Sequence, residues 1–252
     1  MDVQTQVWSP LQDWALWINA WLEGSVSTDA LLDAFSPDAA THRYAGAPII
    51  ELLGVLRALP GASARSGPGV LLTLAGPGDP AALPAGSPAA RQASAAGSLG
   101  GAILVAGGGG WTALVVTRSD ATLEWNAYEL AAPFVPPAPL APGQADLALA
   151  AATREAASAI TAAHPQPGAS PLPDPRLTVG TLRDHYDSIG LPPGTPTRSA
   201  RLIARADQVA AIVEAVLERA GEHGFDPHLL ALTRHIRAAR ESAVAYAVAT
   251  GR

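Results

Sequence analysis

Residues 99–130 constrain the fold more than any other part of the chain. Three short apolar or alternating runs, at 102–106, 112–117 and 123–130, are separated by glycines or polar residues. Runs of this length, rich in β-branched and aromatic residues and bounded by turn residues, are typical of β-strands rather than helices. Residues 118–121 join the last two runs and predict a hairpin turn. The stretch therefore predicts the centre of a small antiparallel sheet.

A fourth strand is predicted at residues 70–74, which form another short apolar run. In the run 123–130, alternation places Leu123 and Trp125 on one face and Glu124 on the other. One face of the sheet should therefore pack in the core, and the other should be exposed to solvent or functional. The rest of the chain is typical of helices and loops. We predict an α+β protein in which a small, mainly antiparallel sheet of about four strands is covered by Ala-rich helices.

Helical periodicity predicts the elements that cover this sheet. A helix from residue 10 to about residue 23 places Trp14, Ile18 and Trp21 on one stripe, with Trp17 beside it. Several indoles on one helix also suit a base-stacking or sugar-binding surface, but their helical spacing favours burial. Further helices are expected near residues 27–35, 48–59, 91–98, 144–163 and 181–189, and an antiparallel pair at about 196–220 and from 226 onward ends the chain.

The domain organisation follows from composition. Residues 1–131 carry the predicted sheet, residues 132–143 form a Pro-rich connector, and residues 144–252 are helical. Residues 1–175 hold 6 Arg and 14 acidic residues, whereas residues 176–252 hold 10 Arg and 8 acidic residues. The opposite charges should attract each other, so we expect the two regions to pack as one globular unit.

Missing residue types exclude several kinds of chemistry. The chain has no Cys, and all 16 basic residues are Arg, so thiol nucleophiles, disulfides, Schiff-base lysines and P-loop lysines are ruled out. Arg in place of Lys, with abundant Ala, Gly and Pro, suggests a high-GC bacterial genome. A net charge of −6 argues against a dedicated nucleic-acid binder. With no signal peptide and no run of about 20 apolar residues, we expect a cytoplasmic protein with no membrane association.

Several local patterns resemble functional motifs only weakly. The four glycines at 107–110 fit neither a dinucleotide nor a Walker fingerprint, and the pattern favours a strand connection. His185 lies among acidic residues at 184–187 and would serve as a general base, but a helix cap with a solvated histidine is the favoured interpretation. His228 and His235 are seven residues apart, a poor spacing for chelation. We predict no metal and no cofactor, and we assign no catalytic residue.

The helix expected near residue 196 has an unusual charge distribution. Arg198, Arg201 and Arg205 lie in its first turns, where the helix dipole disfavours cations, and none has an acidic residue three or four positions further on. Backbone N–H groups, hydroxyls and guanidinium groups together suit an anion. The alternative is that these arginines pair with carboxylates of residues 1–175 or are solvated. The candidate anion-binding residues are Thr195, Thr197, Arg198, Ser199, Arg201 and Arg205.

Two functions from different classes fit this sequence. The favoured prediction is a non-catalytic protein-interaction or assembly protein that uses an apolar helix face to bind a partner or a second copy of itself. The alternative is a binder of, or an enzyme acting on, a phosphorylated or carboxylated small molecule at residues 195–205. Such an enzyme needs a base such as His185 close to Arg198 or Arg201. Nucleic-acid binding ranks third, since it needs the terminal helices to present arginines on one surface clear of acids.

Overall fold

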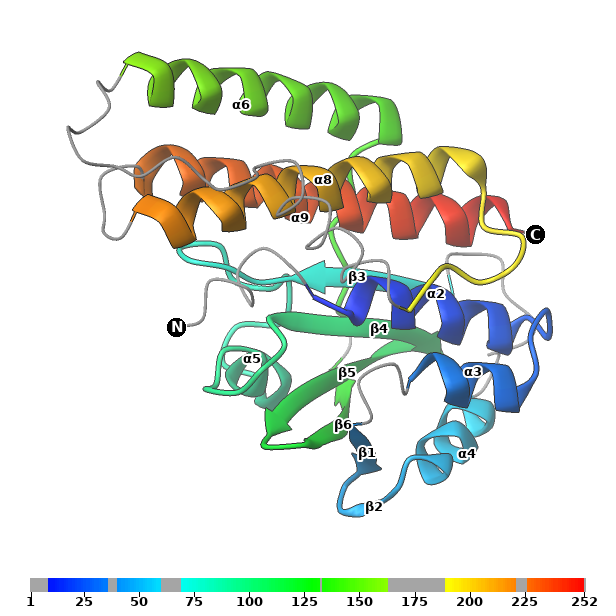
Figure 1. Ribbon diagram of the computed structural model, residues 1–252. Coiled ribbons are helices and arrows are strands. Elements are labelled where there is room, and N and C mark those ends of the chain that lie inside the picture. The colour runs from blue at the N-terminus through cyan, green and yellow to red at the C-terminus, as the bar shows by residue number, and fades with distance from the viewer. Residues whose placement is uncertain are drawn as a thin grey trace.

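The chain folds around a mixed six-stranded sheet that carries helices on both faces (Figure 1). The computed structural model describes residues 9–35, 40–59, 69–131, 133–162, 189–220 and 226–251. The strands are β1 (Thr41–Tyr44), β2 (Ala47–Pro48), β3 (Val70–Leu74), β4 (Gly101–Gly107), β5 (Gly110–Ser119) and β6 (Thr122–Leu130), in the spatial order β2-β1-β6-β5-β4-β3. The described helices are α2 (Leu11–Leu22), α3 (Thr28–Ala34), α4 (Ile50–Ala58), α5 (Pro88–Ala93), α6 (Pro142–Ala162), α8 (Thr197–Ala220) and α9 (Asp226–Thr250).

The predicted α+β class is confirmed, and the four predicted strands correspond to β3, β4, β5 and β6, an antiparallel meander. The four glycines connect two of these strands. Gly107 pairs with Gly110, while Gly108 and Gly109 have φ values of 61° and 80°. A two-residue hairpin turn with two positive φ angles suits glycine, which has no Cβ to clash. The predicted strand connection is therefore correct.

The prediction of about four strands is wrong, because β1 and β2 extend the sheet to six. β1 pairs antiparallel with β2 but parallel with β6, so the sheet is mixed. Only one of the four residues of β1, His42, is buried. The strand therefore shows little of the apolar signal that local sequence reading detects. In the register of β1 with β6, His42 pairs with Leu123, far along the chain, and its ring accepts a hydrogen bond from Trp125.

The α2 helix packs its aromatic stripe into the core. Trp14, Ile18 and Trp21 are 2%, 0% and 5% exposed, as the periodicity predicts. Trp17 is half-buried, and its Nε1–H donates to the carbonyl oxygen of Gly190 at 3.1 Å. The indoles are structural, because burial and internal hydrogen bonds occupy the surfaces that a base or a sugar would need.

The opposite face of the sheet is covered by α5. Ala89 and Ala93 pack there with Leu71 and Leu104. The helix begins three residues earlier than the predicted 91–98 and ends at residue 93. The Ser87 hydroxyl accepts a hydrogen bond from the Ala90 N–H at 3.1 Å and caps a helix whose first residue is proline. The face expected to be wet is thus partly covered.

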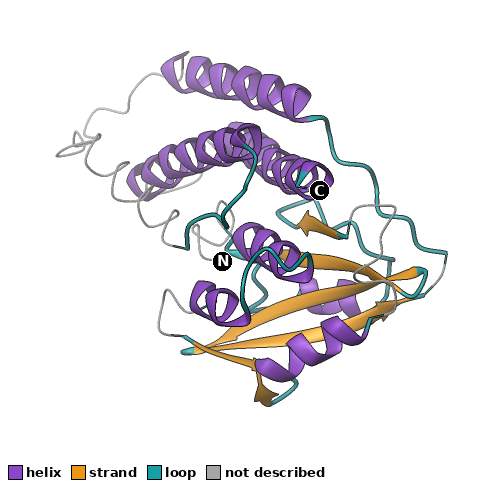
Figure 2. Cartoon of the chain, turned by 90° about the vertical axis from the view of Figure 1, so that its right-hand side faces the viewer, coloured by secondary structure: helices purple, strands orange, loops and turns teal. Residues whose placement is uncertain are grey.

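Three helices form a layer beyond the sheet (Figures 1 and 2). α8 and α9 are the predicted antiparallel pair, α9 also contacts β3 and α2, and α6 lies outermost. Buried alanines line the interface between α8 and α9, which also contains the ion pair Arg240–Asp207 at 2.7 Å. The Pro-rich connector leads from β6 to α6, and the carbonyl oxygen of Leu140 accepts a hydrogen bond from Ser242 on α9 at 2.7 Å.

No helix in the described part of the chain is long and apolar enough to cross a membrane.

Candidate functional site

A surface pocket of about 580 Å³ lies where α6 and α8 begin. α8 contributes Thr197, Leu202 and the three predicted arginines, and α6 contributes residues of its first two turns. The lining residues are Pro142, Gly143, Asp146, Thr197, Arg198, Arg201, Leu202 and Arg205. The structure therefore brings four of the six predicted site residues to one pocket.

Two helix N-termini meet at this pocket. The first N–H groups of an α-helix lack intrahelical acceptors, and the helix dipole adds a partial positive charge there. Pro142 begins α6 and Thr197 begins α8, and neither helix has an acidic residue in its first turn. Both helices therefore direct positive potential towards the same volume.

Gly143 allows Arg198 to lie against the start of α6. A Cβ at position 143 would stand 3.3 Å from Nη2 of Arg198, closer than most side-chain contacts allow. This guanidinium also lies over the ring of Tyr246, whose centroid is 5.9 Å from Cζ of Arg198. A cation over an aromatic ring at this distance is weakly held, which leaves its N–H donors available to a ligand.

Arg205 is paired within the protein. Its Nη1 lies 2.5 Å from Oδ1 of Asp146 on α6, and both side chains are nearly half exposed. This contact matches the alternative that the arginines pair with carboxylates of residues 1–175. The pair ties α6 to α8 along one wall of the pocket.

Arg198 and Arg201 are both exposed, and within the described part of the chain neither forms an ion pair with a carboxylate. The lining therefore holds three guanidinium groups and one carboxylate, a net charge of plus two. A site with this balance favours an anion, and a dianion matches its charge.

Two predicted site residues do not reach the pocket. The Ser199 hydroxyl is buried and donates to the carbonyl oxygen of Ala243 at 2.9 Å, so it links α8 to α9. The Thr195 hydroxyl donates to the carbonyl oxygen of Pro192 at 2.7 Å and closes the turn before α8. Both hydroxyls therefore serve the local fold.

The weaker sequence candidates gain no support as sites. Residues 184–187, including His185, lie outside the described residues. His235 is half-buried on α9, and nothing is described of the His228 side chain. No group of three or more metal-ligating side chains occurs among the residues that the structure describes.

Sequence reasoning missed the contribution of α6. Gly143 and Asp146 lie more than 50 residues before Arg198 in the chain, and nothing in their local pattern connects them with the arginines. The missing acidic residue in the first turn of α6 is a signal of an available helix N-terminus, but it acquires meaning only when the second helix is beside it.

Comparison with known proteins identifies the family of this chain. A protein-family model described as the Rv1486c-like protein N-terminal domain matches residues 12–142. A second family model, for the C-terminal domain, matches residues 143–241. The chain belongs to the Rv1486c-like protein family. In this chain the boundary between the two matched domain models falls at the first turn of α6. The arginine pocket therefore lies at the beginning of the C-terminal Rv1486c-like domain.

Mycobacterial proteins are among the relatives of this Rv1486c-like chain. The "Uncharacterized protein MT1533" and the "Uncharacterized protein Rv1486c", from two strains of Mycobacterium tuberculosis (CDC 1551 / Oshkosh and ATCC 25618 / H37Rv), are each 30% identical to it over 245 residues, or 82% of either chain. The "Uncharacterized protein ML1804" of Mycobacterium leprae (strain TN) is 27% identical over 296 residues, 94% of this chain and 97% of the relative. No solved structure matches the chain.

Proposed function

We propose that the protein binds an anionic small molecule, of the phosphorylated or carboxylated class, in the pocket between α6 and α8. The observation that carries this proposal is the arrangement of Arg198 and Arg201 beside two helix N-termini with no described carboxylate on either guanidinium. Clustered cations repel one another, and a bound anion relieves this repulsion.

The pocket supports binding better than catalysis. Among its described lining residues Asp146 is the one carboxylate, and it is engaged by Arg205. No histidine belongs to that lining. An enzyme that acts on this anion needs a general base in the same pocket. Because the described lining offers none that is available, our proposal is restricted to binding.

The predicted role in protein interaction or assembly remains a prediction. Val135 and Leu147 are 83% and 71% exposed, but they belong to the connector and to α6. Apolar side chains scattered singly over a surface are normal in proteins that do not associate. We therefore place anion binding first.

A thermal-shift experiment tests the proposal. Inorganic phosphate is compared with chloride at matched ionic strength, for the parent and for the Arg198→Gln/Arg201→Gln variant. A ligand that binds the native state raises the melting temperature by mass action. We expect phosphate to stabilise the parent and not the variant. Because both arginines are exposed, the variant should fold normally, losing at most about 1 kcal/mol from the contact with Tyr246.

The matched control removes the same charge elsewhere. Arg91 and Arg154 are exposed and lie outside the pocket lining, so Arg91→Gln/Arg154→Gln should respond to phosphate as the parent does. An equal phosphate response in the Arg198→Gln/Arg201→Gln variant, or none in the parent, contradicts the proposal.

A further inference from the structure

A second cavity, of about 200 Å³, lies between the edge strand β3, the Pro-rich connector and α9. Most of its wall is apolar, since leucines of β3 and β4, alanines and the prolines of the connector surround it. The carboxylate of Glu241, from α9, is the acidic group of this lining. The cavity thus combines apolar walls with one acidic group.

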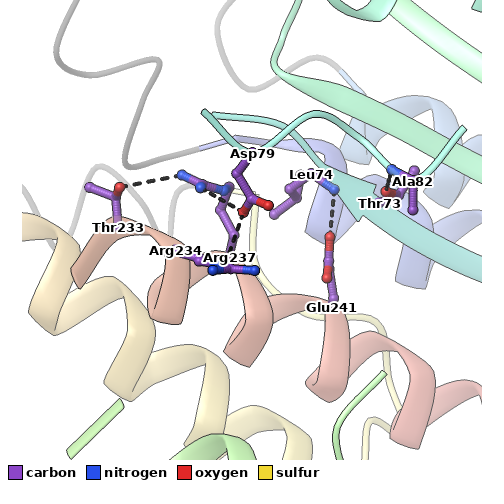
Figure 3. Close-up of polar contacts among 8 residues, drawn as sticks. All are labelled: Thr73, Leu74, Asp79, Ala82, Thr233, Arg234, Arg237 and Glu241. Carbon is purple, nitrogen blue, oxygen red and sulfur yellow. Dashed lines mark hydrogen bonds and ion pairs between the residues drawn. The ribbon is translucent and has the colours of Figure 1, made fainter. Parts of the chain in front are cut away.

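The Glu241 carboxylate faces the open edge of the sheet. Its Oε1 accepts a hydrogen bond from the backbone N–H of Leu74 at 2.6 Å (Figure 3). The Glu241 side chain makes no other hydrogen bond within the described part of the chain. Its second carboxylate oxygen therefore has no donor there. The hydrogen bond also covers a backbone donor that an edge strand would otherwise expose.

The nearby arginines are directed to another carboxylate. Asp79, in the loop after β3, accepts a hydrogen bond from Nη2 of Arg237 at 2.9 Å and lies 3.7 Å from Nε of Arg234 (Figure 3). Burial raises the pKa of Glu241 to about 7; Asp79 adds to this increase, while the Leu74 N–H and Arg237 oppose it. The carboxylate is therefore desolvated without a cation of its own.

We propose that this cavity binds a primary ammonium group on a short aliphatic chain, with Glu241 as its counter-ion. The apolar wall suits the aliphatic chain, and the second oxygen of Glu241 accepts a charge-assisted hydrogen bond from the ammonium group. A volume of about 200 Å³ accommodates roughly six groups the size of a water molecule, enough for a four-carbon amine.

The chain contains no lysine, so none of its own side chains supplies a primary ammonium group. A free alkylamine and a lysine side chain of a partner protein share this chemistry, and the experiment separates the two sources. The proposal is independent of the arginine pocket, which has different lining residues and the opposite charge.

Isothermal titration calorimetry on the full chain tests this proposal. n-Butylammonium chloride is titrated at pH 8, where Glu241 is ionised, with n-butanol as the neutral analogue. We expect butylammonium to bind and butanol to bind at least tenfold more weakly. In Glu241→Gln, which keeps the acceptor for the Leu74 N–H, butylammonium affinity should fall about tenfold or more.

Matched variants and a lysine derivative complete the design. Glu155→Gln removes an exposed carboxylate of α6 and should bind butylammonium as the parent does. Arg198→Gln/Arg201→Gln should also bind it normally, so failure of one proposal is distinguishable from failure of the other. Binding of N-acetyl-lysine methylamide without binding of butylammonium identifies a protein side chain as the ligand, whereas butylammonium binding shows that a free amine suffices.

Equal affinity in the parent and Glu241→Gln, or binding of neither amine by the parent, overturns the proposal. Carbon-detected NMR of the parent provides a readout that does not depend on the variant folding. Saturation with the amine that binds should lower the pKa of the Glu241 carboxyl group from about 7, and an unchanged pKa also overturns the proposal.

Discussion

The sheet region and the helical layer bury their interiors in different ways. Beneath α2, the rings of Trp14, Phe35, His42 and Trp125 form one cluster with centroids 5.1–6.0 Å apart. Trp125 Nε1–H donates to Nδ1 of His42 at 3.0 Å, so two polar groups of the cluster satisfy each other inside it. Large apolar area stabilises this region.

The interface between α8 and α9 is made of small and polar groups. Ala206, Ala210, Ala239 and Ala243 are fully buried there, beside the ion pair Arg240–Asp207. Alanines let two helices approach closely but contribute little apolar area each. A buried ion pair adds little net stability but is costly to break. The two regions therefore differ in what they are sensitive to: lost volume in one and an uncompensated charge in the other.

The largest expected effect is in the aromatic cluster. Trp14→Ala should lower the free energy of unfolding by about 3–5 kcal/mol, because three rings lose a neighbour and a cavity remains. Urea denaturation measures this loss. Trp17→Ala, at a half-buried indole, is the control and should cost less. A loss at Trp14 below about 1 kcal/mol contradicts the comparison, because burial of large rings would then not stabilise the sheet region.

Breaking the buried ion pair should cost somewhat less. Arg240→Met removes the cation that pairs with the Asp207 carboxylate in a buried position, and should destabilise the protein by about 3 kcal/mol. The double variant Arg240→Met/Asp207→Leu removes both charges and should recover most of this loss. Urea denaturation of both variants separates the two cases. A double variant as unstable as the single one would show that packing, rather than charge, limits this interface.

The effect that is smallest per step of the measurement concerns the contact between the two regions, where Glu241 of α9 meets Leu74 of β3. Because its pKa is raised from 4.5 to about 7, with Asp79 and Arg237 nearby, the folded protein favours the protonated acid. Across this window the unfolded chain releases the proton first, so stability should decrease as pH rises from 4.5 to about 7, by at most about 1.4 kcal/mol per pH unit.

Thermal unfolding across this pH range, for the parent and for Glu241→Gln, measures that contribution. The difference between the two melting curves should change through the window and level off below pH 4.5, because Gln does not titrate. A constant difference would mean that Glu241 is ionised in the folded protein throughout, and the two regions would then meet through a charged contact.

Local sequence patterns determined much of the fold. The bounds of α2 and β3 differ by at most one residue from the predicted segments, and α8 and α9 are the expected helix pair. These elements are readable because each has its own hydrophobic periodicity, which depends only on neighbouring residues. The arginine-rich start of α8 was equally visible, since residues three and seven positions apart on a helix share a face.

Tertiary structure alone decided the rest. β1 exists because it pairs with a strand far along the chain, and such pairing leaves little trace in a four-residue segment. The arginine pocket depends on Gly143 and Asp146 of a separate helix. The walls around Glu241 come from two strands, a loop, the connector and α9. A pocket is a property of surfaces that converge in space, and periodicity along one element carries no information about which other element it will face.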